Sequence, residues 1–107
     1  MKETMRVEIL TFEGCPNARS ATELVERIVG ELRRDAVIER IDVPGPRDAE
    51  RLRFLGSPTI RIDGRDVEPG ADERTDYVLA CRVYRTSDGF SGLPDERWLR
   101  DTIVRAR

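Results

Sequence analysis

The alternation of apolar and polar residues predicts a strand near the start of the chain and an amphipathic helix directly after it. Residues 6–11 alternate with apolar groups on both faces, which is typical of a central strand covered by helices on both sides. From about residue 17 to residue 34, apolar residues recur at helical spacing. They are Ala18, Ala21, Leu24, Val25, Ile28 and Leu32. Residues 1–5 are expected to be a frayed start, and Pro16 suits the first helical position because a proline there loses no hydrogen bond.

Shorter elements are predicted in the middle of the chain. They are a strand over 37–43, a helix over 46–55, a strand over 59–62 and a return strand over 65–68. Gly56 suits the left-handed residue that ends a helix, and Asp63-Gly64 is typical of a two-residue hairpin turn. Residues 94–96 begin a terminal helix, with acidic groups in its first turn.

The stretch over 69–93 carries the weakest pattern. Residues 70–80 fit a loop or one helical turn, residues 81–85 alternate like a strand, and Phe90 is expected to pack back onto the core. Because a length of 107 residues suits one domain, the whole chain, 1–107, is predicted to be a single α/β domain. Its predicted order of elements is β-α-β-α-β-β-α.

Composition narrows the classes of function. Arginine supplies 18 of the 19 basic residues, acidic residues number 21, and the net charge of -2 argues against non-specific binding to nucleic acid. No apolar run approaches the roughly 20 residues of a membrane span, and no signal-peptide core is present. A cytoplasmic protein is therefore expected, as a monomer or weak dimer. Histidine is absent, which excludes Ser-His and Cys-His dyads and histidine-bound metals.

The only two thiols belong to Cys15 and Cys81. A cysteine just ahead of a helix faces unpaired N–H groups and the positive end of the helix dipole, and both favour the thiolate. Cys15 is therefore the predicted nucleophile, the alternative being a small buried residue in a turn. The Ser57-Pro58 bond, between a short helix and a strand, could be cis, the alternative being an ordinary trans proline at the start of the strand. The Ser57 backbone would then point toward Cys15 and could pair with an extended peptide or a glutathione-like ligand.

These two regions resemble the thioredoxin superfamily, in particular its small bacterial thioredoxin-like and glutaredoxin-like members. The resemblance lies in Gly14-Cys15-Pro16-Asn17-Ala18, in Gly56-Ser57-Pro58-Thr59-Ile60 and in the turn Asp63-Gly64-Arg65. It covers about residues 5–68 and, loosely, the terminal helix. It implies a thioredoxin-like fold with a mixed central sheet, to which 69–93 is an extra segment. It also implies Cys15 as the attacking thiolate, no cofactor beyond glutathione as a co-substrate, and a substrate-binding groove formed by Pro16, Asn17, Ser57, the cis-proline Pro58 and Thr59.

One position departs from that family's pattern. The family's dithiol motif is Cys-x-x-Cys, and here Ala18 stands at the second cysteine position, so the usual resolving thiol is missing. Cys81 could replace it if the segment 69–93 folds back over the site and brings the two Cα atoms within about 7 Å. Cys81 could equally be a buried strand residue. If the two sulfurs are close, they could also hold a soft ion such as Cu(I) or Hg(II).

Three functions remain open. The first is thiol–disulfide exchange or glutathione-linked redox chemistry through Cys15, with Cys81 or glutathione resolving the mixed disulfide. The second is the binding of a soft metal or a thiol-reactive compound by Cys15 and Cys81. The third is a redox-inactive domain that binds a peptide or another protein along the Pro58 groove. The expected partner is a thiol or disulfide substrate or an extended peptide, and neither nucleic acid nor a membrane is expected.

Overall fold

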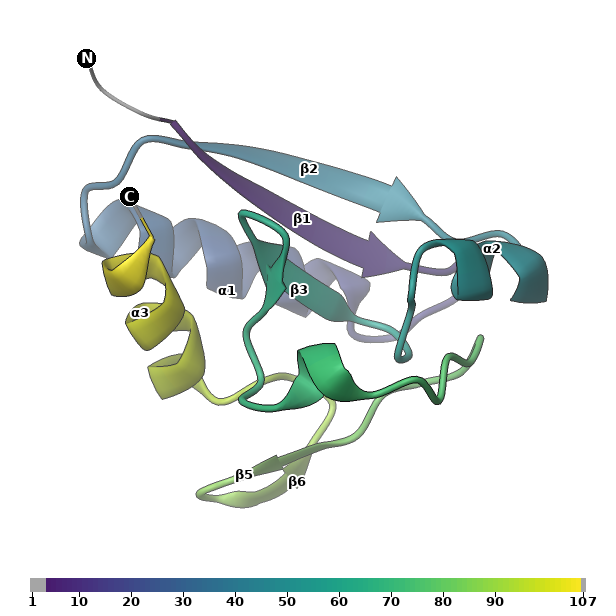
Figure 1. Ribbon diagram of the computed structural model, residues 1–107. Coiled ribbons are helices and arrows are strands. Elements are labelled where there is room, and N and C mark those ends of the chain that lie inside the picture. The colour runs from purple at the N-terminus through teal and green to yellow at the C-terminus, as the bar shows by residue number, and fades with distance from the viewer. Residues whose placement is uncertain (1–3, 107) are drawn as a thin grey trace.

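The computed structural model describes residues 4–106, and its main sheet has the strand order β2-β1-β3-β4 (Figure 1). The strands are β1 (Met5–Thr11), β2 (Ala36–Asp42), β3 (Thr59–Ile62) and β4 (Arg65–Asp66). β1 pairs in parallel with β2 and antiparallel with β3, and β3 pairs antiparallel with β4. The sheet is therefore mixed.

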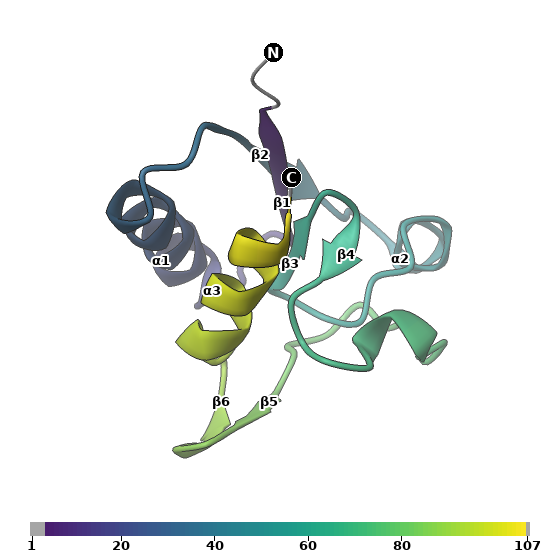
Figure 2. The ribbon, with the colours of Figure 1, turned by 60° about the vertical axis from the view of Figure 1, so that its left-hand side comes forward.

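Helices cover both faces of this sheet. They are α1 (Ala18–Glu31), α2 (Pro46–Arg51) and α3 (Glu96–Arg105). Figure 2 shows α1 and α3 on one side of the strands and α2 on the other. Among the residues described, no helix is long and apolar enough to cross a membrane.

Two groups of buried side chains fill the two sides of the sheet. The first core cluster, beneath α1 and α3, includes Val7, Ile9, Val25, Ile28, Leu99 and Ile103. The second core cluster, on the α2 side, has as its buried members Leu10, Val43, Ala49 and Phe54. Because β1 supplies residues to both clusters, the prediction of a central strand covered on both sides is confirmed.

Strand β1 and helix α1 begin at other residues than expected. β1 includes Met5, whose side chain is fully buried, so residue 5 is not part of a frayed start. Residues 1–3 lie outside the described part of the chain. α1 begins at Ala18, and Pro16 precedes the N-cap residue Asn17, so the placement of this proline at the first helical position is wrong. A turn, not the helix itself, follows Cys15 directly.

Helices α1 and α2 both end earlier in the chain than the spacing of apolar residues predicts. α1 stops at Glu31, and Arg33 takes a left-handed conformation with φ of 51°. α2 stops at Arg51, and Arg53 likewise has φ of 56°. A left-handed residue cannot continue a right-handed helix. Gly56, which was expected to end the second helix, lies beyond this break, and its positive φ of 114° belongs to the turn before β3.

The hairpin that joins β3 to β4 agrees with the sequence. Asp63 and Gly64 have φ of 49° and 85°, as a two-residue turn of this kind requires. β4 is shorter than the expected 65–68. The Val67 N–H still donates to the Ile60 carbonyl of β3 at 3.1 Å, but the Glu68 N–H donates to the Asp66 carboxylate at 2.9 Å and not to β3.

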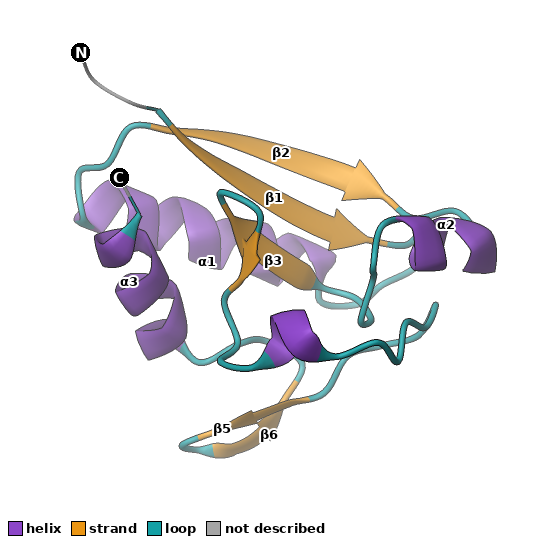
Figure 3. Cartoon of the chain, viewed as in Figure 1, coloured by secondary structure: helices purple, strands orange, loops and turns teal. Residues whose placement is uncertain are grey.

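The segment over 69–93 contains one short helical turn and a separate hairpin (Figure 3). The turn is η1 (Ala71–Glu73), as the loop-or-helical-turn prediction allows. The hairpin consists of β5 (Tyr84–Thr86) and β6 (Gly89–Ser91), so the strand expected over 81–85 forms only in part. The expected packing of Phe90 onto the core is wrong, since 77% of this residue is exposed on the hairpin, outside the main sheet.

Helix α3 begins at Glu96, within the start predicted over 94–96. Asp95 is the N-cap residue, and its carboxylate accepts hydrogen bonds from the N–H groups of Arg97 at 3.0 Å and Ser87 at 3.2 Å. These backbone hydrogen bonds hold the pKa of Asp95 well below its usual range. The same carboxylate therefore ties the start of α3 to the β5–β6 hairpin.

Asp95→Ala is expected to lower the free energy of unfolding by about 1 kcal/mol at neutral pH. Because the pKa of Asp95 is lowered in the folded state, its contribution is complete above the unfolded value of about 3.9 and is lost as the pH falls toward the folded value. The gap between variant and wild type should therefore narrow below about pH 4. Urea denaturation at neutral and acid pH measures this, with the exposed Glu23→Ala as control. An equal loss at both pH values would contradict the prediction.

Candidate functional site

The turn before β3 contains a cis peptide bond between Ser57 and Pro58, as the sequence predicts. Ser57, Pro58 and Thr59 are all buried. The Thr59 hydroxyl donates to the Gly56 carbonyl at 2.6 Å. Because the side chains are covered, this turn meets its neighbours mainly through its backbone groups.

Residues 78–84, called the strap below, run along this turn. The Ser57 N–H donates to the Ala80 carbonyl at 2.8 Å, and the Arg82 N–H donates to the Ser57 carbonyl at 2.9 Å. These two bonds place Cys81 opposite Ser57 in an isolated parallel bridge. Backbone contacts therefore hold Cys81 beside the cis-proline turn.

From Cys81 to Tyr84, the side chains of the strap alternate between exposed and buried. Arg82 and Tyr84 are buried, whereas Cys81 and Val83 are exposed. The alternative in which Cys81 is a buried strand residue is therefore wrong. Its thiol is free and open to solvent.

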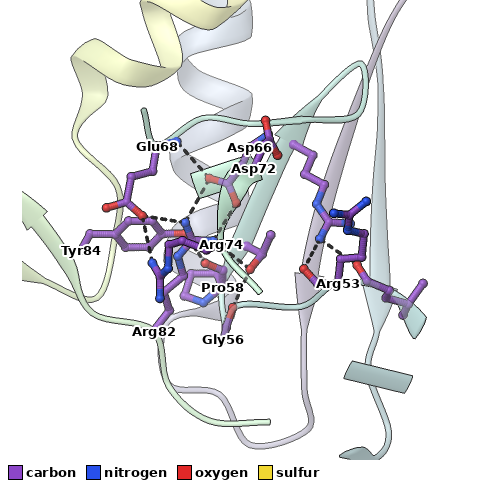
Figure 4. Close-up of polar contacts among 12 residues, drawn as sticks. Arg53, Gly56, Pro58, Asp66, Glu68, Asp72, Arg74, Arg82 and Tyr84 are labelled. Atoms are coloured by element: carbon purple, nitrogen blue, oxygen red, sulfur yellow. Dashed lines mark hydrogen bonds and ion pairs between the residues drawn. The ribbon is translucent and has the colours of Figure 1, made fainter. Parts of the chain in front are cut away.

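The buried Arg82 guanidinium binds two acidic side chains (Figure 4). It donates to both carboxylate oxygens of Asp66, at 2.8 and 3.0 Å, and to Glu68 at 2.8 Å. Burial alone would lower the pKa of Arg82, but the hydrogen bonds to Asp66 and Glu68, together with the nearby negative charge, outweigh burial, and the pKa is raised. The guanidinium therefore stays charged inside the protein.

Two further contacts join this group to the cis-proline turn. Arg82 donates to the Thr59 hydroxyl at 3.0 Å, and its guanidinium carbon lies 4.4 Å from the centre of the Tyr84 ring, within cation–π range. The Tyr84 hydroxyl donates to the Pro58 carbonyl, and burial raises the pKa of Tyr84. The strap is thus attached to the turn by side chains as well as by backbone.

Cys15 is a free, half-buried thiol between β1 and α1. It lines an open pocket at the carboxyl ends of β1 and β2, together with residues that include Phe12 and Arg40. The Cys15 N–H donates to the Phe12 carbonyl at 3.1 Å, and the Ala18 N–H donates to the Cys15 carbonyl at 3.4 Å. The thiol belongs to a turn two residues ahead of the N-cap Asn17, farther from the helix N-terminus than the sequence indicates.

The expected site residues form two groups. The first lies at the strap and consists of Ser57, Pro58, Thr59 and Cys81. The second lies between β1 and α1 and consists of Cys15, Pro16 and Asn17. The residues lining the Cys15 pocket include none of the first group, and no disulfide joins the two cysteines. The Asn17 amide packs closely against Gly92, and Pro16 is exposed.

Sequence reasoning missed the group of Arg82, Asp66 and Tyr84. The signal was two short alternating runs, one placing Arg82 and Tyr84 on the same face and the other placing Asp66 and Glu68 on the same face. Opposite charges on two such faces are compatible with an ion pair, but neither run specifies which faces meet. Neither run indicates that the ion pair of Arg82 and Asp66 would be buried.

The arrangement suits thiol chemistry more than metal binding by a ligand cluster. A half-buried thiol that lines an open pocket can attack a disulfide or another electrophile once it is deprotonated. Among residues 4–106, no three Cys, Asp or Glu side chains gather in a way that could hold a metal ion. No model of a known protein family matches the chain, and no curated protein matches it.

Proposed function

We propose that this protein carries out thiol–disulfide exchange, or glutathione-linked redox chemistry, through Cys15. The observation that carries the proposal is the free, half-buried Cys15 thiol in an open pocket ahead of α1. The cis Ser57-Pro58 bond supports it. So does the resemblance of residues 5–68 to the thioredoxin superfamily.

The first chemical step forms a mixed disulfide. The Cys15 thiolate attacks one sulfur of a disulfide RSSR, the Cys15–SR bond forms, the S–S bond breaks, and the leaving thiolate takes up a proton. In the glutathione route, a glutathione thiolate attacks the R sulfur, so that RSSG leaves and the Cys15 thiolate is regenerated. In the two-cysteine route, the Cys81 thiolate attacks the Cys15 sulfur, the Cys15–SR bond breaks, the leaving R thiolate takes up a proton, and a Cys15–Cys81 disulfide forms. Two glutathione molecules then reduce this disulfide to the two thiols while they become glutathione disulfide.

Cys15→Ser is expected to abolish the reduction of bis(2-hydroxyethyl) disulfide by glutathione above the uncatalysed rate. The physical reason is that a serine hydroxyl is not ionised at neutral pH and cannot take part in disulfide exchange. The readout is the formation of glutathione disulfide, coupled to NADPH consumption by glutathione reductase. Wild-type activity in the Cys15→Ser variant would overturn the proposal.

Cys81→Ser is the matched variant that separates the two routes. If glutathione resolves the mixed disulfide, Cys81→Ser keeps its rate, and mass spectrometry of the oxidised protein finds a glutathione adduct. If Cys81 resolves it, the wild type loses two hydrogens on oxidation and the variant slows. The structure brings Cys81 to the cis-proline turn, and this experiment measures whether its thiol reaches Cys15.

A second candidate is the binding of a soft metal ion. The observation that favours it is that Cys15 and Cys81 are both free and accessible thiols, and two thiolates suit Hg(II) or Cu(I). Stoichiometric Hg(II) uptake that is lost in Cys15→Ser, in a wild type that reduces no disulfide, would favour this candidate. The third alternative, a redox-inactive peptide-binding domain, is less favoured because the backbone groups of Ser57 already bond to the strap.

A further inference from the structure

A small cavity lies next to the residues that follow α2. Its volume is about 250 Å³, and the residues that line it include Arg53, Arg61 and Tyr77. Neither cysteine lines this cavity, and it shares no lining residue with the Cys15 pocket. Sites for small molecules usually begin near 300 Å³, so the cavity suits an ion or a compound of a few atoms. What it binds is independent of the chemistry proposed for Cys15.

The Arg61 guanidinium on one wall is held by neutral acceptors. It donates through Nη2 to the Leu52 carbonyl at 2.8 Å and to the Arg53 carbonyl at 2.7 Å. Both carbonyls follow the last residue of α2, where a helix leaves C=O groups without partners of its own. Among the residues described, Arg61 forms no ion pair. Because a guanidinium carries five N–H groups, its charge and at least three donors remain for a ligand.

Arg53 and Tyr77 bring further donors to the same cavity. The Val78 N–H donates to the Phe54 carbonyl at 2.9 Å, and this bond brings the residues just before each of them together. Arg53 donates through Nε to the Tyr77 hydroxyl at 3.1 Å. A hydroxyl that accepts one hydrogen bond can still donate its own proton. Arg53, too, forms no ion pair within residues 4–106, so its charge is not neutralised there.

The other charged residues of the lining are Asp66, Asp72 and Arg74. Asp66 is neutralised by Arg82, which donates to both of its carboxylate oxygens. Arg74 is neutralised by Asp76, to which it donates at 3.0 and 2.7 Å. Asp72 accepts the Asp66 N–H at 3.1 and 3.2 Å and, among the residues described, has no arginine partner. Two arginines and one aspartate therefore carry the unpaired charge of the lining, and the excess is positive.

We propose that this cavity binds a phosphate group, either the free ion or the phosphate of a small organic monoester, through Arg53, Arg61 and Tyr77. Near neutral pH a phosphate monoester carries about -1.5 to -2 charge and has three strong acceptor oxygens. These oxygens match donors that come from three separate side chains. A carboxylate has a single charge and two oxygens, which one guanidinium can satisfy alone. Since neutral acceptors already hold both guanidinium groups, binding needs little further ordering of the protein.

Titration of the wild-type protein with inorganic phosphate tests the proposal, at constant ionic strength and near neutral pH. Calorimetry and phosphorus NMR should both find one saturable site. Arg53→Gln is expected to weaken binding about tenfold, because it removes charged donors but keeps a polar side chain. The matched control is Arg85→Gln, at an exposed arginine of β5 outside the cavity, and it should leave the affinity unchanged. An absence of saturable binding in the wild type, or an equal loss in the two variants, overturns the proposal.

Asp72→Asn should change the affinity in the opposite direction. It removes the unpaired negative charge of the lining, while its amide oxygen can still accept the Asp66 N–H. Phosphate should then bind several-fold more tightly, and an unchanged or lower affinity overturns the proposal. Arg61→Gln is not the deciding variant, since Arg61 also bonds to the carbonyls after α2 and its loss could unfold the protein. Arg53 is exposed, so the Arg53→Gln result stands by itself.

A comparison of three anions identifies the source of the phosphate group. The anions are inorganic phosphate, methyl phosphate and acetate, each titrated into the wild-type protein at the same ionic strength. Tighter binding of methyl phosphate than of inorganic phosphate supports an organic monoester as the ligand, and the reverse order supports the free ion. Acetate should bind at least tenfold more weakly than either, because it has one charge and two oxygens. Acetate binding as tight as that of phosphate overturns the proposal.

Discussion

Arg82→Met is expected to lower the free energy of unfolding by about 3–5 kcal/mol, because it breaks a buried ion pair from one side. Only 2% of each side chain is exposed in the pair of Arg82 with Asp66. Methionine keeps much of the apolar stem of arginine but leaves the Asp66 carboxylate buried without its main cation. An unpaired buried charge costs far more than the loss of an exposed ion pair.

Urea denaturation of Arg82→Met and of a matched control measures this effect. The control is Arg97→Met, which makes the same substitution at a side chain that is 70% exposed and should change stability by less than about 1 kcal/mol. Adding Asp66→Asn to Arg82→Met should recover part of the loss, since the amide carries no charge. A loss of stability in Arg82→Met as small as in the control would mean that the Asp66 carboxylate becomes hydrated in the variant. The inference that the buried ion pair holds the strap firmly would then be wrong.

The elements that the sequence predicts well are those specified by neighbouring residues. The two-faced apolar run of β1, the stripe of α1 and the Asp63-Gly64 turn each depend on a few consecutive positions, and all three are present. The start of α3 within 94–96 is another such local feature. The ends of α1 and α2 were less predictable, because arginines at 33 and 53, and not glycines, take the left-handed conformation.

The strap could not be predicted in the same way, because its contacts join residues far apart in the chain. Ser57 and Arg82 pair across 25 positions, and no periodic pattern specifies that pairing. An arginine in a segment rich in charges is also read as a solvent-exposed residue, since arginine is rarely buried unless it is paired. The burial of Arg82 depends on Asp66 and Glu68 coming from another element, which only the tertiary structure shows.

The candidate thiols were predictable as residue types but only in part as positions. Cys15 lies before α1 as expected, yet a turn separates it from the helix, so the expected effect of the helix dipole on its sulfur remains a prediction. The exposure of Cys81 follows from its neighbour Arg82, whose buried side chain forces the alternate residue outward. The exposure of Cys81 therefore depends on the buried ion pair of Arg82 as well as on the position of the cysteine in the chain.

Phe54→Ala is expected to lower the free energy of unfolding by about 3–5 kcal/mol through the cavity that it leaves. Phe54 is fully buried and belongs to the second core cluster, whose buried members number only four, so few neighbours can move in to fill the space. The partly buried Leu79 of the strap packs on the same cluster. The substitution is therefore expected to loosen the strap as well as α2.

Phe90→Ala provides the matched control, since it removes the same atoms from a residue that is 77% exposed and should change stability by less than about 0.5 kcal/mol. Urea denaturation gives both values, and amide exchange at Val78 and Ser57 tests the link to the strap. If Phe54→Ala is strongly destabilised while both amides keep their protection relative to global unfolding, α2 and the strap unfold separately. If protection at Val78 and Ser57 falls when the Phe54 ring is removed, two sets of contacts hold the strap. The second core cluster holds its first part, and the Arg82 ion pairs hold its later part. The attachment of the strap to the cis-proline turn would then depend on this hydrophobic contact as well as on the buried ion pair.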